Sequence, residues 1–222
     1  MSLRKYPVNA IHAWSAHNLL RSVTNSREDP SCTKAIPSDI TIGQPKNISI
    51  TSSDVHRSYL IVVPPLYTSQ PSTPVIFSFH GGHRNASQQL ALDQISNPEF
   101  NDFAITIYPQ GVKGKWEGNP GNTANDTQLV MYTDRSALGT SMALRDELGL
   151  KNVTTDLTND TVVYSYGKGE DEGLVQHVFD RKLGHDWPST VLNADLIGHG
   201  ERPASFDATP MILDFFQNHI LP

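Results

Sequence analysis

The chain has 222 residues, of which 37% are hydrophobic and 18% are charged, and its formal net charge is −6. This composition is typical of a globular protein with a sizeable core, and the length fits one domain rather than two. The net negative charge and the scattered basic residues argue against nucleic acid and anionic membranes as partners. No apolar run approaches the roughly 20 residues that span a bilayer.

We expect residues 1–40 to form a poorly ordered N-terminal tail and residues 41–222 to form the folded domain. The tail shows no clean periodicity and ends in a stretch rich in proline and serine. Its first 20 residues do not have the apolar core of a secretory signal, because polar residues such as Asn9, His12 and His17 interrupt it.

Short apolar runs, each bounded by prolines or polar turns, predict the buried strands of an α/β sheet. In chain order these runs cover residues 58–63, 75–79, 104–108, 161–166 and 174–179. Helical patterns are predicted over residues 88–93, 137–148 and 209–219. The last of them is amphipathic, which is typical of a helix that packs one face on a core.

Five Asn-x-Ser/Thr sequons suggest an exported glycoprotein, since chance would supply roughly two. The acceptor residues are Asn47, Asn85, Asn125, Asn152 and Asn159. Cys32 is the only cysteine, so no disulfide can form within the chain. It is either a buried thiol or a cysteine left without its partner.

Two segments could carry chemistry. His80, Gly81 and Gly82 directly follow a predicted strand, where glycines allow backbone N–H groups to approach a substrate as an oxyanion hole does. An ordinary glycine turn would have the same sequence. His185 follows the last predicted strand and precedes the C-terminal helix, which is the place of the catalytic base in α/β-hydrolases.

Longer stretches around these two segments resemble the type C feruloyl esterases of filamentous fungi, which belong with acetyl xylan esterases and polyhydroxybutyrate depolymerases. The resemblance covers roughly residues 32–128 and 145–221. The segments that carry it include Lys34-Ala-Ile-Pro37, Ile76-Phe-Ser-Phe-His-Gly-Gly82, Ile107-Tyr-Pro-Gln-Gly111, Trp116-Glu-Gly118, Gly184-His-Asp-Trp-Pro-Ser189 and Ala208-Thr-Pro-Met-Ile-Leu-Asp-Phe-Phe216.

The resemblance implies an α/β-hydrolase-like fold, with a mostly parallel sheet flanked by helices and incomplete in its centre. It also implies a secreted serine esterase without a metal or organic cofactor. Such an enzyme would cleave the ester that joins ferulate to the arabinose side chains of xylan in plant cell walls. His185 would act as the base, and Trp116 and Trp187 could stack on the sugar, although core packing would explain either tryptophan equally well.

The family's Gly-x-Ser-x-Gly nucleophile elbow and its catalytic acid are missing from this sequence. Only 17 residues separate Thr127 from Arg145, which is too few for a strand, an elbow, a helix and an acid-bearing strand. Ser141 is the nearest substitute nucleophile, but a helix N-cap explains it as well. We therefore expect an impaired or inactive esterase.

Three alternatives remain open. The first is a non-catalytic carbohydrate-binding protein of the same family. The second is His199 as a competing base. For His185 itself, Asp186 and Asp195 are too close in sequence to reach around and orient its ring. The third is a metal site built from His80 and His83 with His185 or His199.

Overall fold

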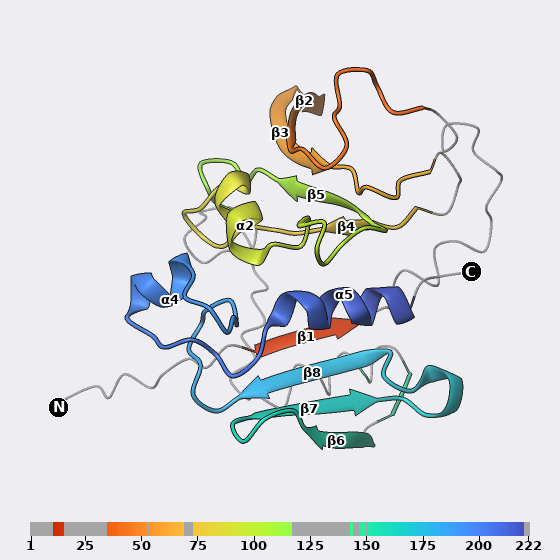
Figure 1. Ribbon diagram of the computed structural model, residues 1–222, viewed down its shortest axis with the longest axis vertical. Coiled ribbons are helices and arrows are strands. Elements are labelled where there is room, and N and C mark those ends of the chain that lie inside the picture. The colour runs from red at the N-terminus through yellow and green to blue at the C-terminus, as the bar shows by residue number, and fades with distance from the viewer. Residues whose placement is uncertain are drawn as a thin grey trace. The chain divides into compact units, whose positions relative to one another are not determined.

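The computed structural model describes residues 11–15, 35–52, 54–68, 73–116, 143, 147–149 and 151–219. The chain divides into two compact units (Figure 1). The terminal unit comprises Met1–Asn25 and Met131–Pro222, and the central unit comprises Ser26–Val130. Strand β1 (Ile11–Ser15) belongs to the sheet of the terminal unit.

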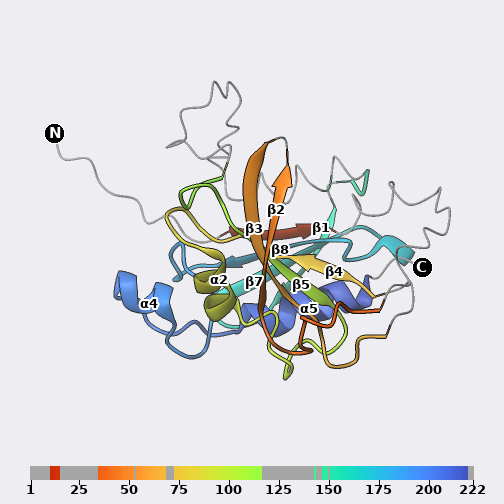
Figure 2. The ribbon, with the colours of Figure 1, turned by 90° about the horizontal axis from the view of Figure 1, so that it is seen from above.

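The sheet of the central unit has the strand order β2-β3-β5-β4 (Figure 2). β2 (Lys46–Ser52) and β3 (Val55–Val62) form an antiparallel hairpin, and β3 also pairs antiparallel with β5 (Ile105–Pro109). β5 pairs in parallel with β4 (Val75–Phe77). Parallel neighbours need a long crossover connection, and helix α2 (Ala86–Asp93) lies within the connection from β4 to β5.

The core of the central unit forms where α2 packs on the sheet. Val62, Ala86 and Tyr108 are buried together, and Leu60 and Leu90 pack against them. Burying these apolar surfaces stabilises the unit at about 25 cal/mol per Å² removed from water.

A buried polar network connects α2 to the strands of this unit. Asp93, the last residue of α2, accepts hydrogen bonds from Ser78, from Gln89 (3.0 Å), from the Tyr108 hydroxyl (3.2 Å) and from the Ile95 backbone N–H (3.0 Å). Burial raises the pKa of the Asp93 carboxyl, although these hydrogen bonds oppose the shift. The network therefore fixes the C-terminal end of α2 against the sheet.

The sheet of the terminal unit is antiparallel throughout and has the strand order β1-β8-β7-β6. Its other strands are β6 (Asn152–Asp156), β7 (Thr161–Tyr166) and β8 (Val175–Asp180). The chain passes from β7 to β8 through Gly167 and a short 3-10 turn. Gly167 has φ 105°, and a Cβ there would lie 1.9 Å from the Asp171 carbonyl oxygen, so only glycine fits.

Two helices follow β8 in the chain. Helix α4 (Ala194–His199) is short, and helix α5 (Ala208–Asn218) lies along the sheet in Figure 1. Val163 and Val178, from neighbouring strands, are buried with Ala208 and Ile212 of α5. The amphipathic C-terminal helix predicted from the sequence is thereby confirmed.

The predicted α/β-hydrolase-like, mostly parallel sheet is wrong. Among the described strands, only β4 and β5 pair in parallel. The physical reason is the length of the connections. Residues 157–160 join β6 to β7 and residues 167–174 join β7 to β8, whereas a parallel pair requires a crossover of a dozen residues or more.

One outer strand of each sheet bears a predicted glycosylation site. β2 and β6 each lie at one edge of their sheet, and Asn47 and Asn152 on these strands are exposed. Among the described helices, none combines the length and the apolar character needed to cross a membrane.

Candidate functional site

The segment that follows β8 is anchored by Asp180, the last residue of that strand. One carboxylate oxygen of Asp180 accepts the backbone N–H groups of Lys182 and Leu183, both at 2.8 Å. The other accepts the Thr161 hydroxyl at 2.5 Å. A buried carboxylate is costly unless hydrogen bonds compensate it, and these bonds also fix the direction in which the chain leaves the sheet.

Helix α4 and the preceding segment are held together by reciprocal hydrogen bonds. The Asn193 side chain caps α4 by accepting the N–H groups of Asp195 and Leu196, both at 3.0 Å, and donates to the Trp187 carbonyl at 2.9 Å. Asp195 in turn accepts the Trp187 N–H at 3.3 Å. Leu196 is fully buried, so α4 has a fixed position within the terminal unit.

These contacts bring Asp186 and His199 together. A carboxylate oxygen of Asp186 lies within hydrogen-bonding distance of Nδ1 of His199, the last residue of α4. The Asp186 side chain is 1% exposed and the His199 side chain is 57% exposed. Gly200 ends the helix in the left-handed conformation (φ 71°) that glycine favours, which lets the chain turn away directly after His199.

A carboxylate accepts hydrogen bonds only, so Nδ1 of His199 must donate to Asp186. This fixes the tautomer and the orientation of the imidazole, and it places Nε2 on the side of the ring away from the carboxylate. The carboxylate also stabilises the imidazolium that forms when Nε2 takes a proton. A buried acid that orients a more exposed histidine is the arrangement that hydrolases use for general base catalysis.

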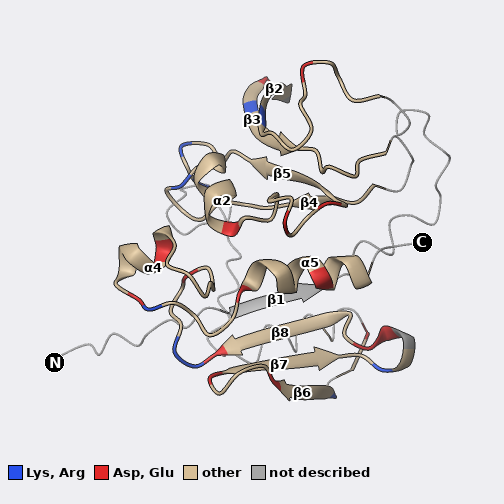
Figure 3. Cartoon of the chain, viewed as in Figure 1, with Lys and Arg blue, Asp and Glu red and all other residues tan. Residues whose placement is uncertain are grey.

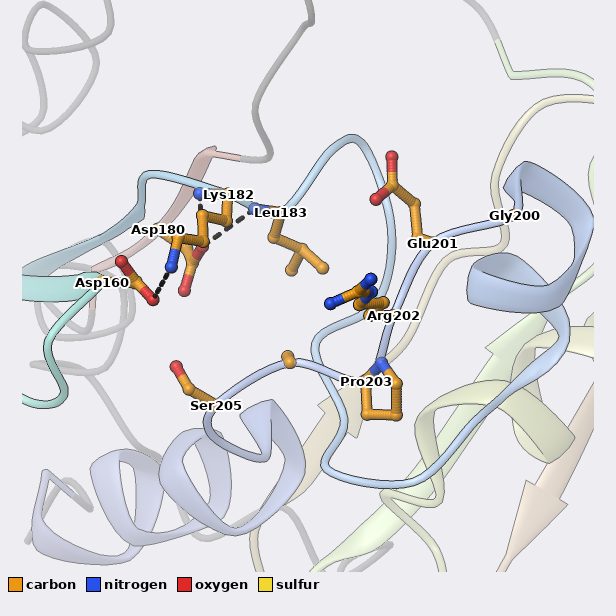
Figure 4. A pocket seen from close by; sticks show the side chains of 10 residues that line it. Asp160, Asp180, Lys182, Leu183, Gly200, Glu201, Arg202, Pro203 and Ser205 are labelled. Carbon is orange, nitrogen blue, oxygen red and sulfur yellow. Dashed lines mark hydrogen bonds and ion pairs between the residues drawn. The ribbon is translucent and has the colours of Figure 1, made fainter.

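A polar pocket of about 440 Å³ lies in the same unit (Figure 4). Asp160, Asp180, Lys182, Leu183 and residues 200–205 line it. Figure 3 shows that acidic and basic positions both occur along the segments between β8 and α5. The volume is within the range of small-molecule sites, about 300–1,000 Å³.

Chain neighbours of the Asp186–His199 pair line this pocket, while the pair itself is not part of its wall. Gly200, the residue after His199, is part of the pocket wall. A Cβ placed on Gly184 would lie 3.4 Å from an Asp186 carboxylate oxygen and 3.6 Å from a carboxylate oxygen of Glu201, which also lines the pocket. Both carboxylates are thus within 4 Å of the same point beside Gly184.

His185, the base predicted from the sequence, is exposed on the segment after β8. Its position in the chain is as expected, but the structure places the neighbouring carboxylate of Asp186 against His199 instead. From the sequence, Asp186 is a candidate only as a partner of His185. The sequence signal for the Asp186–His199 pair is a second histidine, His199, which lies 13 residues after Asp186 at the end of the short helix α4.

The predicted oxyanion segment belongs to the central unit. His80 is buried, its Nδ1 lies 2.7 Å from the Gly81 carbonyl, and its Nε2 accepts the Gly111 N–H at 2.9 Å. Both ring nitrogens are thus used in local hydrogen bonds, which argues against His80 as a metal ligand. Gly81 and Gly82 are exposed.

The two tryptophans singled out by the sequence have different surroundings. Trp187 packs against the core that α5 forms with its sheet and donates from Nε1 to the Thr209 hydroxyl at 3.2 Å. Core packing therefore accounts for it. Trp116 donates to the His80 carbonyl at 2.7 Å and contacts the rings of Phe79 and His80, with centroid distances of 5.1 and 4.7 Å. Phe79 is 57% exposed, so this aromatic group reaches the surface.

The remaining predicted residues are distributed as follows. Asn85 is exposed and caps α2, and Asn159 is exposed beside β7. Ser141, Asn125 and Cys32 lie outside the described residues, as does most of the helix expected over residues 137–148. Within the described residues, no group of three His, Cys, Asp or Glu side chains is placed to hold a metal ion.

Comparisons of this chain with protein-family models, with curated proteins and with solved structures found no match.

Proposed function

We propose that this chain hydrolyses carboxylic esters, with His199 as the general base and Asp186 as the residue that orients it. The Asp186–His199 pair carries the proposal, because a buried carboxylate holds the Nδ1 side of a more exposed imidazole. The substrate class comes from the resemblance described above. It is an ester of ferulate, or of a related hydroxycinnamate, on the sugar side chains of plant xylan, and such a substrate would be met outside the cell.

The reaction needs no group beyond the chain and water. Nε2 of His199 takes a proton from the attacking water as its oxygen bonds to the ester carbonyl carbon, and the carbonyl electron pair moves to the oxygen. As the tetrahedral intermediate collapses, the ester C–O bond breaks and the imidazolium returns its proton to the sugar oxygen. The products are a hydroxycinnamic acid and a free sugar hydroxyl. Asp186 keeps its charge throughout and stabilises the imidazolium.

We expect slow turnover. General base catalysis contributes about 10²–10⁴-fold, whereas a serine enzyme gains more from its covalent step and its oxyanion hole. The nucleophile elbow is missing from the sequence. A low rate is consistent with the impaired esterase that the sequence predicts.

The test is hydrolysis of methyl ferulate by the purified chain and by three variants: His199→Asn, Asp186→Asn and His185→Asn. We expect His199→Asn to lose about 100-fold or more in kcat/KM. Asp186→Asn should lose a comparable factor, because an amide no longer stabilises the imidazolium. His185→Asn is the matched control, since it changes an exposed imidazole one residue away from Asp186.

The outcomes separate the competing bases. Loss of activity in His185→Asn, with His199→Asn unaffected, would assign the base to His185 as the family resemblance predicts and would refute the role of His199. Equal activity in all four proteins would show that neither histidine is the base. Absence of turnover in the parent chain would leave the carbohydrate-binding alternative, which binding of xylo-oligosaccharides without hydrolysis would support.

A further inference from the structure

We propose that the polar pocket of the terminal unit binds one neutral sugar ring through hydrogen bonds to its hydroxyl groups. The inference rests on the proposed function only in naming the sugar as that of the ester substrate. Binding itself follows from the chemistry of the pocket wall and requires no turnover.

The charges of the wall disfavour an anion. Lys182 lies 2.7 Å from Asp160, so these two charges compensate each other. Counting Arg202, Glu201 and Asp180 as well, the three acidic and two basic residues of the wall give a net charge of about −1. A phosphate or carboxylate ligand would meet that charge, and among the described residues no acidic cluster is suited to a metal cation.

Hydrogen-bond donors and acceptors both line the pocket. Lys182 and Arg202 can only donate, Asp160 and Glu201 can only accept, and the Ser205 hydroxyl can do both. Figure 4 shows the guanidinium of Arg202 and the hydroxyl of Ser205 directed toward the open space between the two sides. A sugar hydroxyl also donates and accepts, so a ring carrying several hydroxyls matches such a wall better than an apolar ligand does.

The hydroxyl of Ser205 is held in place by its neighbours. It lies 2.9 Å from the Thr158 hydroxyl and 3.2 Å from the Thr161 hydroxyl, and Thr161 donates to Asp180. This chain of hydroxyls connects the rim of the pocket to the buried carboxylate beneath it. A pre-oriented donor and acceptor loses little entropy on binding, which favours recognition of a small polar ligand.

The pocket wall contains no aromatic residue among those described, so recognition depends on hydrogen bonds alone. We therefore expect a weak dissociation constant for a single sugar, about 1 mM.

Isothermal titration calorimetry with arabinose and xylose tests the proposal, with glucuronate and inorganic phosphate as anionic comparisons. The variants are Arg202→Gln and Ser205→Ala, and the control is Arg181→Gln, an exposed arginine that does not line the pocket. We expect a neutral sugar to bind more tightly than either anion. Arg202→Gln should weaken its binding about tenfold, since a hydrogen bond to a charged group is lost, and Arg181→Gln should leave it unchanged.

Three results would overturn the proposal: tighter binding of phosphate or glucuronate than of the sugars, no saturable sugar binding, or equal affinity in Arg202→Gln and Arg181→Gln. Thermal melting of each variant confirms that the fold is retained. Titration of the His199→Asn chain separates this proposal from the proposed function. That variant should keep its affinity for the sugar while it loses hydrolysis.

Discussion

Replacing His177 with leucine should stabilise the protein and make its stability less sensitive to acid. His177 lies in β8 opposite Tyr164 of β7, and the two ring centroids are 5.6 Å apart. It is 2% exposed, and neither ring nitrogen has a hydrogen-bond partner among the described residues. Burial lowers the pKa of His177 below its ordinary value of 6.5, because the charged form cannot be solvated there.

The direction of the pH effect follows from that shift. Below pH 6.5 the unfolded chain binds a proton at His177, whereas the folded chain does not until the pH reaches the lowered pKa. The free energy of unfolding therefore decreases as the pH falls from 6.5 toward that lowered pKa. For one group the slope cannot exceed about 1.4 kcal/mol per pH unit. Above pH 6.5 this contribution is constant.

At pH 8 the gain comes from the unsatisfied nitrogens. Each buried polar group without a partner costs about 1–3 kcal/mol of stability, which leucine would recover. The different shape of leucine costs up to about 1.5 kcal/mol, which offsets part of this gain. We therefore expect His177→Leu to raise the free energy of unfolding by about 1–2 kcal/mol at pH 8, and by more at pH 5.5.

Urea unfolding of the parent and the variant at pH 8 and pH 5.5 measures both effects. His56→Leu is the control for replacing a histidine with leucine at the surface, because His56 is an exposed residue of β3. If His177→Leu and the parent lose the same stability between the two pH values, His177 is not the group that titrates and the reasoning is refuted.

Two further predictions concern the backbone. Gly167→Ala should lower the free energy of unfolding, measured in urea, by at least about 2 kcal/mol, because its Cβ would collide with the Asp171 carbonyl. The control is Gly169→Ala, which has φ 61° but open space around it and should lower the free energy of unfolding by only about 1 kcal/mol. Equal losses in the two variants would contradict the collision. Asn85→Ala should cost about 1 kcal/mol, since it removes the capping box with Gln88 at the start of α2; an unchanged urea midpoint would show that the cap contributes nothing.

The sequence predicted the elements whose apolar pattern is strong. β3, β5, β7, β8, α2 and α5 all lie at or near their expected positions. β6 was missed because its five residues, Asn-Val-Thr-Thr-Asp, are all exposed and lack the alternation that reveals a half-buried strand. Its pairing with β7 depends on backbone hydrogen bonds, which a hydrophobic pattern does not reveal.

The short apolar runs and the family resemblance both favoured a parallel sheet, whereas the chain length between strands favours antiparallel pairing. The turn of residues 167–174 was visible in the sequence, and its length alone favours an antiparallel pair. The Asp186–His199 pair was a different case, because it depends on α4 folding back onto the preceding segment. Local patterns carry no information about such a contact.

Two of the predicted glycosylation sites lie on outer strands, where a glycan would affect aggregation. An outermost strand offers unpaired N–H and C=O groups to any other strand, and proteins protect such strands with charge, proline or a covering group. Asn47 on β2 and Asn152 on β6 are exposed on the outer strand of the two sheets. A glycan at either position would sterically block a second molecule from adding a strand there. Protein made in a host that does not glycosylate would have no glycan on either strand. We expect it to aggregate more readily as its concentration increases.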